Sequence, residues 1–303
     1  MTSISTSTSA FYDRAKNDIG GLRSRAEALQ AQLGSGDKLA RSSDDPVAAS
    51  RLRMLARTDK LSNIDESNAG RASADLTLAD SALKTFADYI TNAKVLANNA
   101  ANGTLTDAQR ASIGYEIEQI FGNMVNLANS RDSNGHALFG GESAGDAYQL
   151  NTVTGKPEYI GTLSAGDLAL GDGQSISRGL TGRQILGTEP NDILTKLQKL
   201  AADLQTGVGD RQKMANDGIS MLEGSLDQIT TSQTLVGSRL NWIDLTTERR
   251  TNLGELRADE QTRIGATDLP STIAELQQTM TVLEASQASF TKLSSLTLFS
   301  MLN

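Results

Sequence analysis

The scarcity of proline most constrains what this chain can fold into. Across 303 residues there are only four prolines: Pro46, Pro157, Pro190 and Pro270. Residues 47–156 and 191–269 therefore lack the residue that most strongly breaks helices. Within both spans apolar residues recur three and four positions apart, the spacing of one helical face. We expect a mainly α protein, whose N- and C-terminal halves form a long coiled-coil-like rod.

Two apolar seams are especially regular, and an alternating spacing of three and four is typical of coiled-coil packing. The first contains Ala69, Ala72, Leu76, Ala79, Leu83, Phe86, Ile90, Ala93, Ala97 and Ala100. The second contains Ile219, Leu222, Leu226, Ile229, Gln233, Val236, Leu240 and Ile243. Trp242 adjoins the second seam, and we expect it to be a packing residue.

Two helix starts have recognisable caps. In Asp44-Asp45-Pro46, Asp45 can accept hydrogen bonds from free amides as N-cap, and Pro46 suits the first helical position. Thr106 and Gln109 have the spacing of a capping box. Helix capping explains the aspartate pair without a bound cation, which would need several converging oxygen ligands.

The helical period is lost between residues 139 and 189, where glycine is frequent and short runs read as strand, turn, strand. We expect a small β-rich domain at 139–189, inserted into a helical bundle formed by 45–138 and 190–267. The ends, 1–44 and 268–303, are predicted to be terminal helices.

The composition excludes several classes of function. No cysteine is present, so disulfides, thiol nucleophiles and thiolate metal sites are absent. The net charge of −8, without a basic block, argues against nucleic acid or an anionic membrane as main partner. No apolar stretch is long enough to span a bilayer, and the polar N-terminus is not a cleavable signal peptide. His136, the single histidine, is expected to be a solvated loop residue. We expect no catalytic site, cofactor or metal.

The terminal segments carry apolar stripes that need a partner, because isolated helices of this length are marginal in water. Either they pack on each other in a finished monomer, or they order only when neighbouring subunits bury them. The periodicity leaves both open. The stripe residues predicted to form an assembly interface are Ile19, Leu22, Leu29, Leu33, Leu276, Met280, Leu283, Phe290 and Phe299.

Several motifs resemble one known family along nearly the whole chain. Residues 32–49, ending in Ser42-Ser-Asp-Asp-Pro-Val-Ala-Ala49, are similar to the "SSG…SDDPVAA" stretch of the bacterial flagellar hook–filament junction family, hook-associated protein 3. The run 127–141 resembles its "LAN…D..G.YLFSG" motif, although His136 and Gly140 depart from it. Further similar positions are 100–104, 159–161, 180–185 and the hydrophobic close at 294–303.

The resemblance implies a structural, non-enzymatic subunit of the flagellum. It implies export without a cleaved signal, an extracellular location and a cytoplasmic export chaperone. The implied partners are the preceding hook-associated protein, flagellin and further copies in a ring or helical layer. The terminal helices would form the inner coiled-coil layer, and the β domain would lie at the surface.

Two alternatives remain. The chain could be a short flagellin, although flagellins usually show "DDAAG" where this chain has Asp44-Asp-Pro-Val-Ala48. It could also be a flagellin-like surface protein whose β domain binds a polysaccharide through Phe139, Tyr148 or Tyr159.

Overall fold

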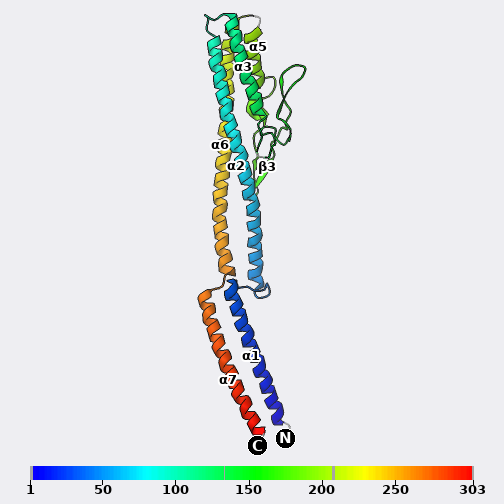
Figure 1. Cartoon of the computed structure of the whole chain (residues 1–303), viewed down its shortest axis with the longest axis vertical. Helices are drawn as coiled ribbons and strands as arrows, with labels where there is room; N and C mark the ends of the chain where they lie inside the picture. The colour runs from blue at the N-terminus through cyan, green and yellow to red at the C-terminus, as the bar shows by residue number, and fades with distance from the viewer. Residues whose placement is uncertain (1–2, 133, 207–208, 302–303) are drawn as a thin grey trace. The chain divides into compact units, whose positions relative to one another are not determined.

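A computed structural model describes residues 3–132, 134–206 and 209–301, with side chains described between residues 10 and 294. Its described part forms seven α-helices and four short strands, which confirms the predicted mainly α fold with a β-rich insertion (Figure 1). The helices are α1 (Ser3–Ser35), α2 (Pro46–Ala100), α3 (Asp107–Ala128), α4 (Gly182–Leu186), α5 (Ile193–Thr206), α6 (Arg211–Gly265) and α7 (Leu269–Met301). The strands are β1 (Tyr148–Leu150), β2 (Pro157–Tyr159), β3 (Asp167–Gly171) and β4 (Gln174–Ser177).

The chain divides into two compact units. Unit 1 comprises residues 1–60 and 252–303, and unit 2 comprises residues 61–251. Unit 1 has 13 basic and 13 acidic residues, whereas unit 2 has 15 basic and 23 acidic ones. The whole net charge of −8 therefore belongs to unit 2. The predicted boundaries at 44/45, 138/139, 189/190 and 267/268 concern layers of an assembly and stay predictions.

In unit 1, α1 and α7 run side by side (Figure 1). Gly36 ends α1 with a positive φ of 76°, a left-handed conformation that glycine adopts without a steric penalty. Its amide donates to the Gln32 carbonyl at 2.9 Å. The Lys38 amide then donates to the Gly265 carbonyl at 2.7 Å, which joins the segment after α1 to the end of α6.

The core of unit 2 follows the predicted seam of α2. Every residue of that seam, from Ala69 to Ala100, is buried. α3 and α5 pack closely where Gly114 faces the backbone of Ala201 and Gln205. A Cβ at Gly114 would lie 2.9 Å from the Ala201 carbonyl oxygen. Because glycine has no side chain, α3 and α5 can approach each other this closely.

The predicted seam of α6 is only half right. Leu222, Ile229, Val236 and Ile243 are buried as expected. The remaining buried positions, however, include Gly218 before Leu222, and Ser225 and Ser232 between the apolar residues, whereas the predicted Gln233 is only partly buried. The predicted Ile219, Leu226 and Leu240 are only partly buried at the flank of the core. The serine hydroxyls donate to carbonyls four residues earlier, so small polar residues fit the interface without unpaired groups.

The prediction for Trp242 is wrong. Its side chain is 44% exposed, because it precedes the buried Ile243 by one position, which turns it away from the centre of the seam. Leu235 and Leu245 on the same helix are also exposed. α6 therefore carries an uncovered apolar row in unit 2, which we call the α6 row: Leu235, Trp242 and Leu245.

The β insertion consists of two separate antiparallel hairpins, β1–β2 and β3–β4. Tyr148 pairs with Tyr159 in the first, and Leu168 pairs with Ile176 in the second. The first hairpin is short because the Asn151 side chain accepts from the amides of Val153 and Thr154 and closes the turn early. No described helix combines the length and hydrophobicity needed to cross a membrane.

Candidate functional site

The first candidate site is the helix pair of unit 1. α1 presents a stripe with three- and four-residue spacing that faces α7. Tyr12 stacks edge-on against Phe290, with ring centroids 5.5 Å apart. At the other end of the pair, Arg25 makes an ion pair with Glu275. Ala26, Leu29 and Leu283 are buried between the helices.

Most of the predicted assembly residues lie in this intramolecular seam. Leu29 and Leu283 are buried, while the others in the seam are half-buried: Ile19, Leu22, Leu33, Leu276 and Phe290. Met280 lies on the flank of α7 and is 37% exposed. Phe299 belongs to α7, but its side chain lies outside the described residues.

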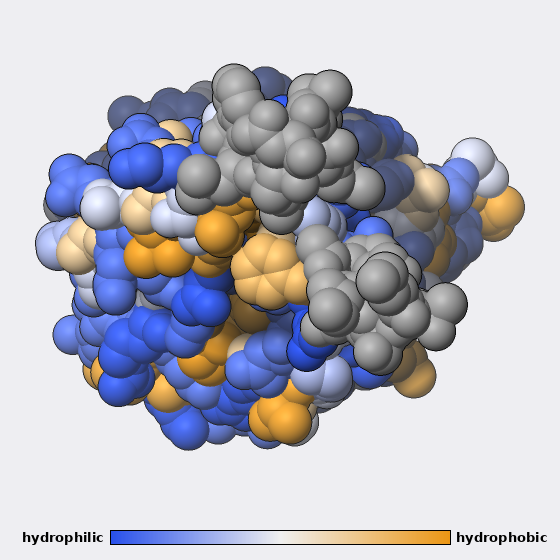
Figure 2. Space-filling view, turned by 90° about the horizontal axis from the view of Figure 1, so that it is seen from below, coloured by the Kyte–Doolittle hydropathy of each residue, from blue (hydrophilic) through white to orange (hydrophobic). Residues whose placement is uncertain are grey.

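The face left outside the seam is also apolar in places. Ile273, Val282 and Leu293 are each more than 40% exposed on α7. Figure 2, seen from below, shows hydrophobic residues in small groups among hydrophilic ones. Ile273 lies two and a half helical turns from Val282 and thus on the opposite side of α7, so these are single exposed apolar residues, which are ordinary on a protein surface.

The aspartate motif forms a turn and a cap. Asp44 Oδ2 accepts from the Arg41 amide at 2.8 Å. Asp45 Oδ1 accepts from the amides of Val47 at 3.1 Å and Ala48 at 2.9 Å, at the start of α2. Pro46 is the first residue of this helix. Among the described residues, no group of three or more acidic or histidine side chains could hold a metal ion.

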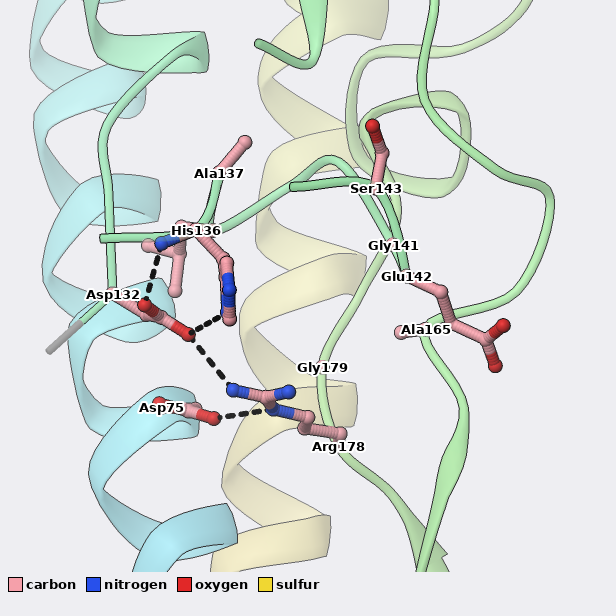
Figure 3. Close-up of a pocket in the computed structure, with 11 residues that line it drawn as sticks. Asp75, Asp132, His136, Ala137, Gly141, Glu142, Ser143, Ala165, Arg178 and Gly179 are labelled. Atoms are coloured by element: carbon pink, nitrogen blue, oxygen red, sulfur yellow. Dashed lines mark hydrogen bonds and ion pairs between the residues drawn. The ribbon is translucent and has the colours of Figure 1, made fainter. Parts of the chain in front are cut away.

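The second candidate site is a charged cluster in unit 2, formed by Asp75, Asp132, His136 and Arg178 (Figure 3). It lines a hollow of about 160 Å³. Arg178 Nε donates to Asp75 Oδ2 at 2.9 Å, and its Nη2 donates to Asp132 Oδ2 at 2.8 Å. Both carboxylates are less than a tenth exposed, and a single guanidinium serves as the shared counter-charge of both.

The pKa of Asp132 lies below its usual value. Burial raises it, but hydrogen bonds from the backbone amides of His136 and Asn134 outweigh burial, with help from the charge of Arg178. These amides donate to Asp132 Oδ1 at 2.9 and 2.8 Å. Asp132 thereby fixes both its own loop and the segment that carries Arg178.

This cluster lacks the arrangement needed for nucleophilic catalysis. His136 Nδ1 is 3.9 Å from Asp132 Oδ2, and the imidazole is half exposed. Ser143 lines the same hollow but points away from His136 in Figure 3. Its hydroxyl instead accepts from the Gly145 amide at 3.3 Å. A nucleophile and base must lie within hydrogen-bonding reach of each other, so the geometry is that of a structural ion-pair network.

The β3–β4 hairpin is attached to the helices by contacts that the sequence does not predict. Two arginines of α6 donate to backbone carbonyls: Arg239 to Gly179 at 2.8 Å, and Arg250 to Leu170. From α2, the Asn68 side-chain Nδ2 donates to the Ala169 carbonyl at 3.1 Å. Arginine spacing alone could not reveal these contacts, because their acceptors are backbone groups distant in sequence.

The aromatic residues considered for polysaccharide binding form part of the packed interior. Phe139 is 1% exposed and Tyr148 is 4% exposed. Tyr159 donates its hydroxyl to the Thr162 carbonyl at 2.7 Å and packs edge-on against Tyr148. Burial raises the pKa of both tyrosines. Phe139 and Tyr148 therefore present no open face on which a sugar ring could stack.

The sequence and the fold are similar to those of known flagellar proteins. Residues 5–144 match the family model of the bacterial flagellin N-terminal helical region. The flagellar hook-associated protein 3 of Escherichia coli (strain K12) is 27% identical, covering 97% of this chain and 98% of that protein. A putative flagellar hook-associated protein from Vibrio parahaemolyticus has a similar solved structure, with a TM-score of 0.67 and 20% identity. It covers 74% of this chain and 100% of its own.

A further solved structure, the flagellar junction protein FlgL from Legionella pneumophila, has a TM-score of 0.58 at 12% identity. It covers 71% of this chain and 99% of its own. The solved structures show that the chain shares their fold, and residues 5–144 match the flagellin N-terminal helical region. Along nearly its whole length the chain is similar to hook-associated protein 3 of Escherichia coli and Salmonella typhimurium, the family that its sequence motifs resemble.

Proposed function

We propose that this chain is a structural subunit of the bacterial flagellum that joins the preceding hook-associated protein to flagellin. The observation that carries this proposal is the similarity to hook-associated protein 3 along nearly the full length of both chains. Its action would be mechanical and non-enzymatic, through packing with neighbours above and below. We further propose an extracellular location, reached by export without a cleaved signal and with the help of a cytoplasmic chaperone.

The charge distribution supports assembly through unit 1. When identical units gather around one axis, like net charges repel one another. Unit 1 has balanced charge, whereas unit 2 carries all eight net negative charges. A neutral terminal unit can pack densely with its copies in a ring or helical layer, as the inner coiled coil. The charged unit, which includes the β insertion, would remain at the outside.

The α1–α7 seam gives the test. Leu29 is 7% exposed, and replacing it with aspartate would place an unpaired charge against α7. We expect Leu29→Asp to abolish motility in a host that lacks its own junction protein. Gln30→Asp is the matched control, because Gln30 is an exposed neighbour on the same helix. Normal motility with Leu29→Asp would overturn the assembly role of the seam.

A second experiment distinguishes a junction subunit from a short flagellin. Purified protein should remain in short assemblies or as monomer, because a junction layer has a different partner on each side. Electron microscopy under conditions that polymerise flagellin tests this. Long filaments formed by this chain alone would favour the flagellin alternative.

Limited proteolysis tests whether the terminal helices order only on assembly. If they do, protease should remove about 40 residues from each end of the purified monomer and leave a resistant helical core. Mass spectrometry of the fragments identifies the cut sites. Protection of both ends would show that the α1–α7 pair is already stable in the monomer.

A further inference from the structure

Unit 2 contains a second hollow that no part of the proposed function uses. It has a volume of about 440 Å³ and lies between α3, α5 and the turn that joins β1 to β2. We call it the hairpin groove. Its polar lining includes Glu118 on α3, Thr154 and Lys156 in the turn, and Thr195, Gln198, Lys199 and Gln205 on α5. This volume falls within the range of about 300–1,000 Å³ that is common for ligand clefts.

The walls of the hairpin groove are held in place by hydrogen bonds. The Gln198 side chain on α5 donates to the Gly155 carbonyl at 2.8 Å, which fixes the turn against the helix. Asn151 Oδ1 accepts from the Thr154 amide at 2.9 Å within the turn. Across the groove, Gln205 donates to Glu118 at 2.9 Å. A site that is organised before binding loses less entropy when a ligand enters.

The hairpin groove presents two ammonium groups that have no acidic partner. Lys156 and Lys199 are both exposed, and neither makes an ion pair with any residue of the described ranges. The Thr195 hydroxyl is enclosed and lacks a hydrogen-bond partner among the same residues. The groove therefore combines two cations with amide and hydroxyl groups, and its one carboxylate, that of Glu118, accepts a hydrogen bond from Gln205. Beside them, Ala201, Ala202 and Phe121 form an apolar part of the lining.

We propose that the hairpin groove binds an acidic saccharide, with carboxylates spaced along a sugar chain. The lysines would pair with sugar carboxylates, and the glutamine side chains would hydrogen-bond to sugar hydroxyls. The small apolar area fits the C–H face of a sugar ring. A densely charged polyanion fits poorly, because unit 2 carries a net charge of −8. This inference does not depend on the junction role.

The experiment is calorimetric titration of the full chain with trigalacturonic acid. Maltotriose serves as the neutral probe, and inorganic phosphate tests whether a free anion suffices. We expect saturable binding of trigalacturonic acid alone. In the double variant K156Q/K199Q, affinity should fall about tenfold or more, because two charge-assisted contacts are lost. Both residues are exposed, so circular dichroism should show an unchanged fold.

The matched control is Lys84→Gln on α2, which makes the same change of charge outside the groove, where Lys84 pairs with Asp80. It should bind trigalacturonic acid like the wild type. Three outcomes would overturn the proposal: no heat of binding at millimolar concentration, equal binding of maltotriose or phosphate, or equal loss in the Lys84 control.

Discussion

Arg178 Nε donates a hydrogen bond to Asp75 Oδ2 at 2.9 Å and thereby joins the segment after β4 to α2 across 103 residues of sequence. Because Arg178 also binds Asp132, it connects the loop after α3 to the same helix. Three segments distant in sequence meet at one guanidinium. The β insertion is thus fixed to the helices by a charge network as well as by apolar packing.

Removing this guanidinium should strongly destabilise unit 2. Arg178→Ala would leave two buried carboxylates without a counter-charge, and we expect the free energy of unfolding to fall on the order of 3 kcal/mol. Urea unfolding followed by circular dichroism measures it. Arg131→Ala is the control, because the Arg131–Asp146 pair is about half exposed and should contribute less than about 1 kcal/mol. Equal effects of the two substitutions would contradict the role of Arg178.

The pKa of Asp132 predicts a pH dependence of stability. Its pKa is lowered in the folded protein, whereas an unfolded aspartate has a pKa of about 3.9. The stabilisation is therefore fully present above about pH 4 and is lost as the pH falls through the folded pKa. We expect Asp132→Asn to be less stable than the wild type at pH 7, and this difference should shrink toward pH 3. A difference that stays constant in urea unfolding between pH 7 and pH 3 would disprove it.

Two glycines of α3 should respond oppositely to alanine. At Gly114 a Cβ would lie 2.8 Å from Gln205 Cγ and 2.9 Å from the Ala201 carbonyl oxygen, so Gly114→Ala must force α3 and α5 apart. We expect a loss of about 1–3 kcal/mol. At Gly122 nothing lies within 4 Å, so Gly122→Ala should stabilise the helix by about 0.5–1 kcal/mol. Thermal unfolding of both variants provides the comparison, and equal shifts would contradict the close approach.

Sequence periodicity was sufficient to predict the buried face of a helix where that face packs through apolar side chains. The α2 seam follows the predicted spacing because alanine and larger apolar residues occupy every contact position. The Thr106 cap could be predicted because Gln109, its partner, is three residues away. In α6, sequence periodicity predicted that Ile219 would be a buried seam residue, whereas the structure buries Gly218. Hydrophobicity ranks isoleucine higher, whereas close helix packing selects the smaller residue.

The charged cluster could not be predicted in the same way. Asp75, Asp132 and Arg178 come from three distant segments, and each alone is an ordinary charged residue. Only the fold brings them together. The same holds for the hairpin groove, because its two lysines lie on a turn and on α5. The family resemblance did not predict these contacts either. It implied sequence motifs and the layers of an assembly, but no contact between particular side chains.

The α6 row predicts a change in tryptophan fluorescence on assembly. Trp242 is the only tryptophan of the chain and is 44% exposed, with Leu235 and Leu245 uncovered on the same helix. If a neighbouring subunit covers this row, the indole moves from water to an apolar contact. We expect the emission maximum to shift to shorter wavelength when flagellin and the preceding hook-associated protein are added together.

Two substitutions make this prediction specific to the α6 row. Leu245→Asp should prevent the fluorescence shift and weaken assembly, since it places a charge in the apolar contact. Val153→Asp should have no effect, although Val153 is 91% exposed, because it lies at the turn of the β1–β2 hairpin. Complete assembly without any shift, seen by electron microscopy of the same sample, would show that the row stays in contact with water. Its apolar side chains would then play no part in joining subunits.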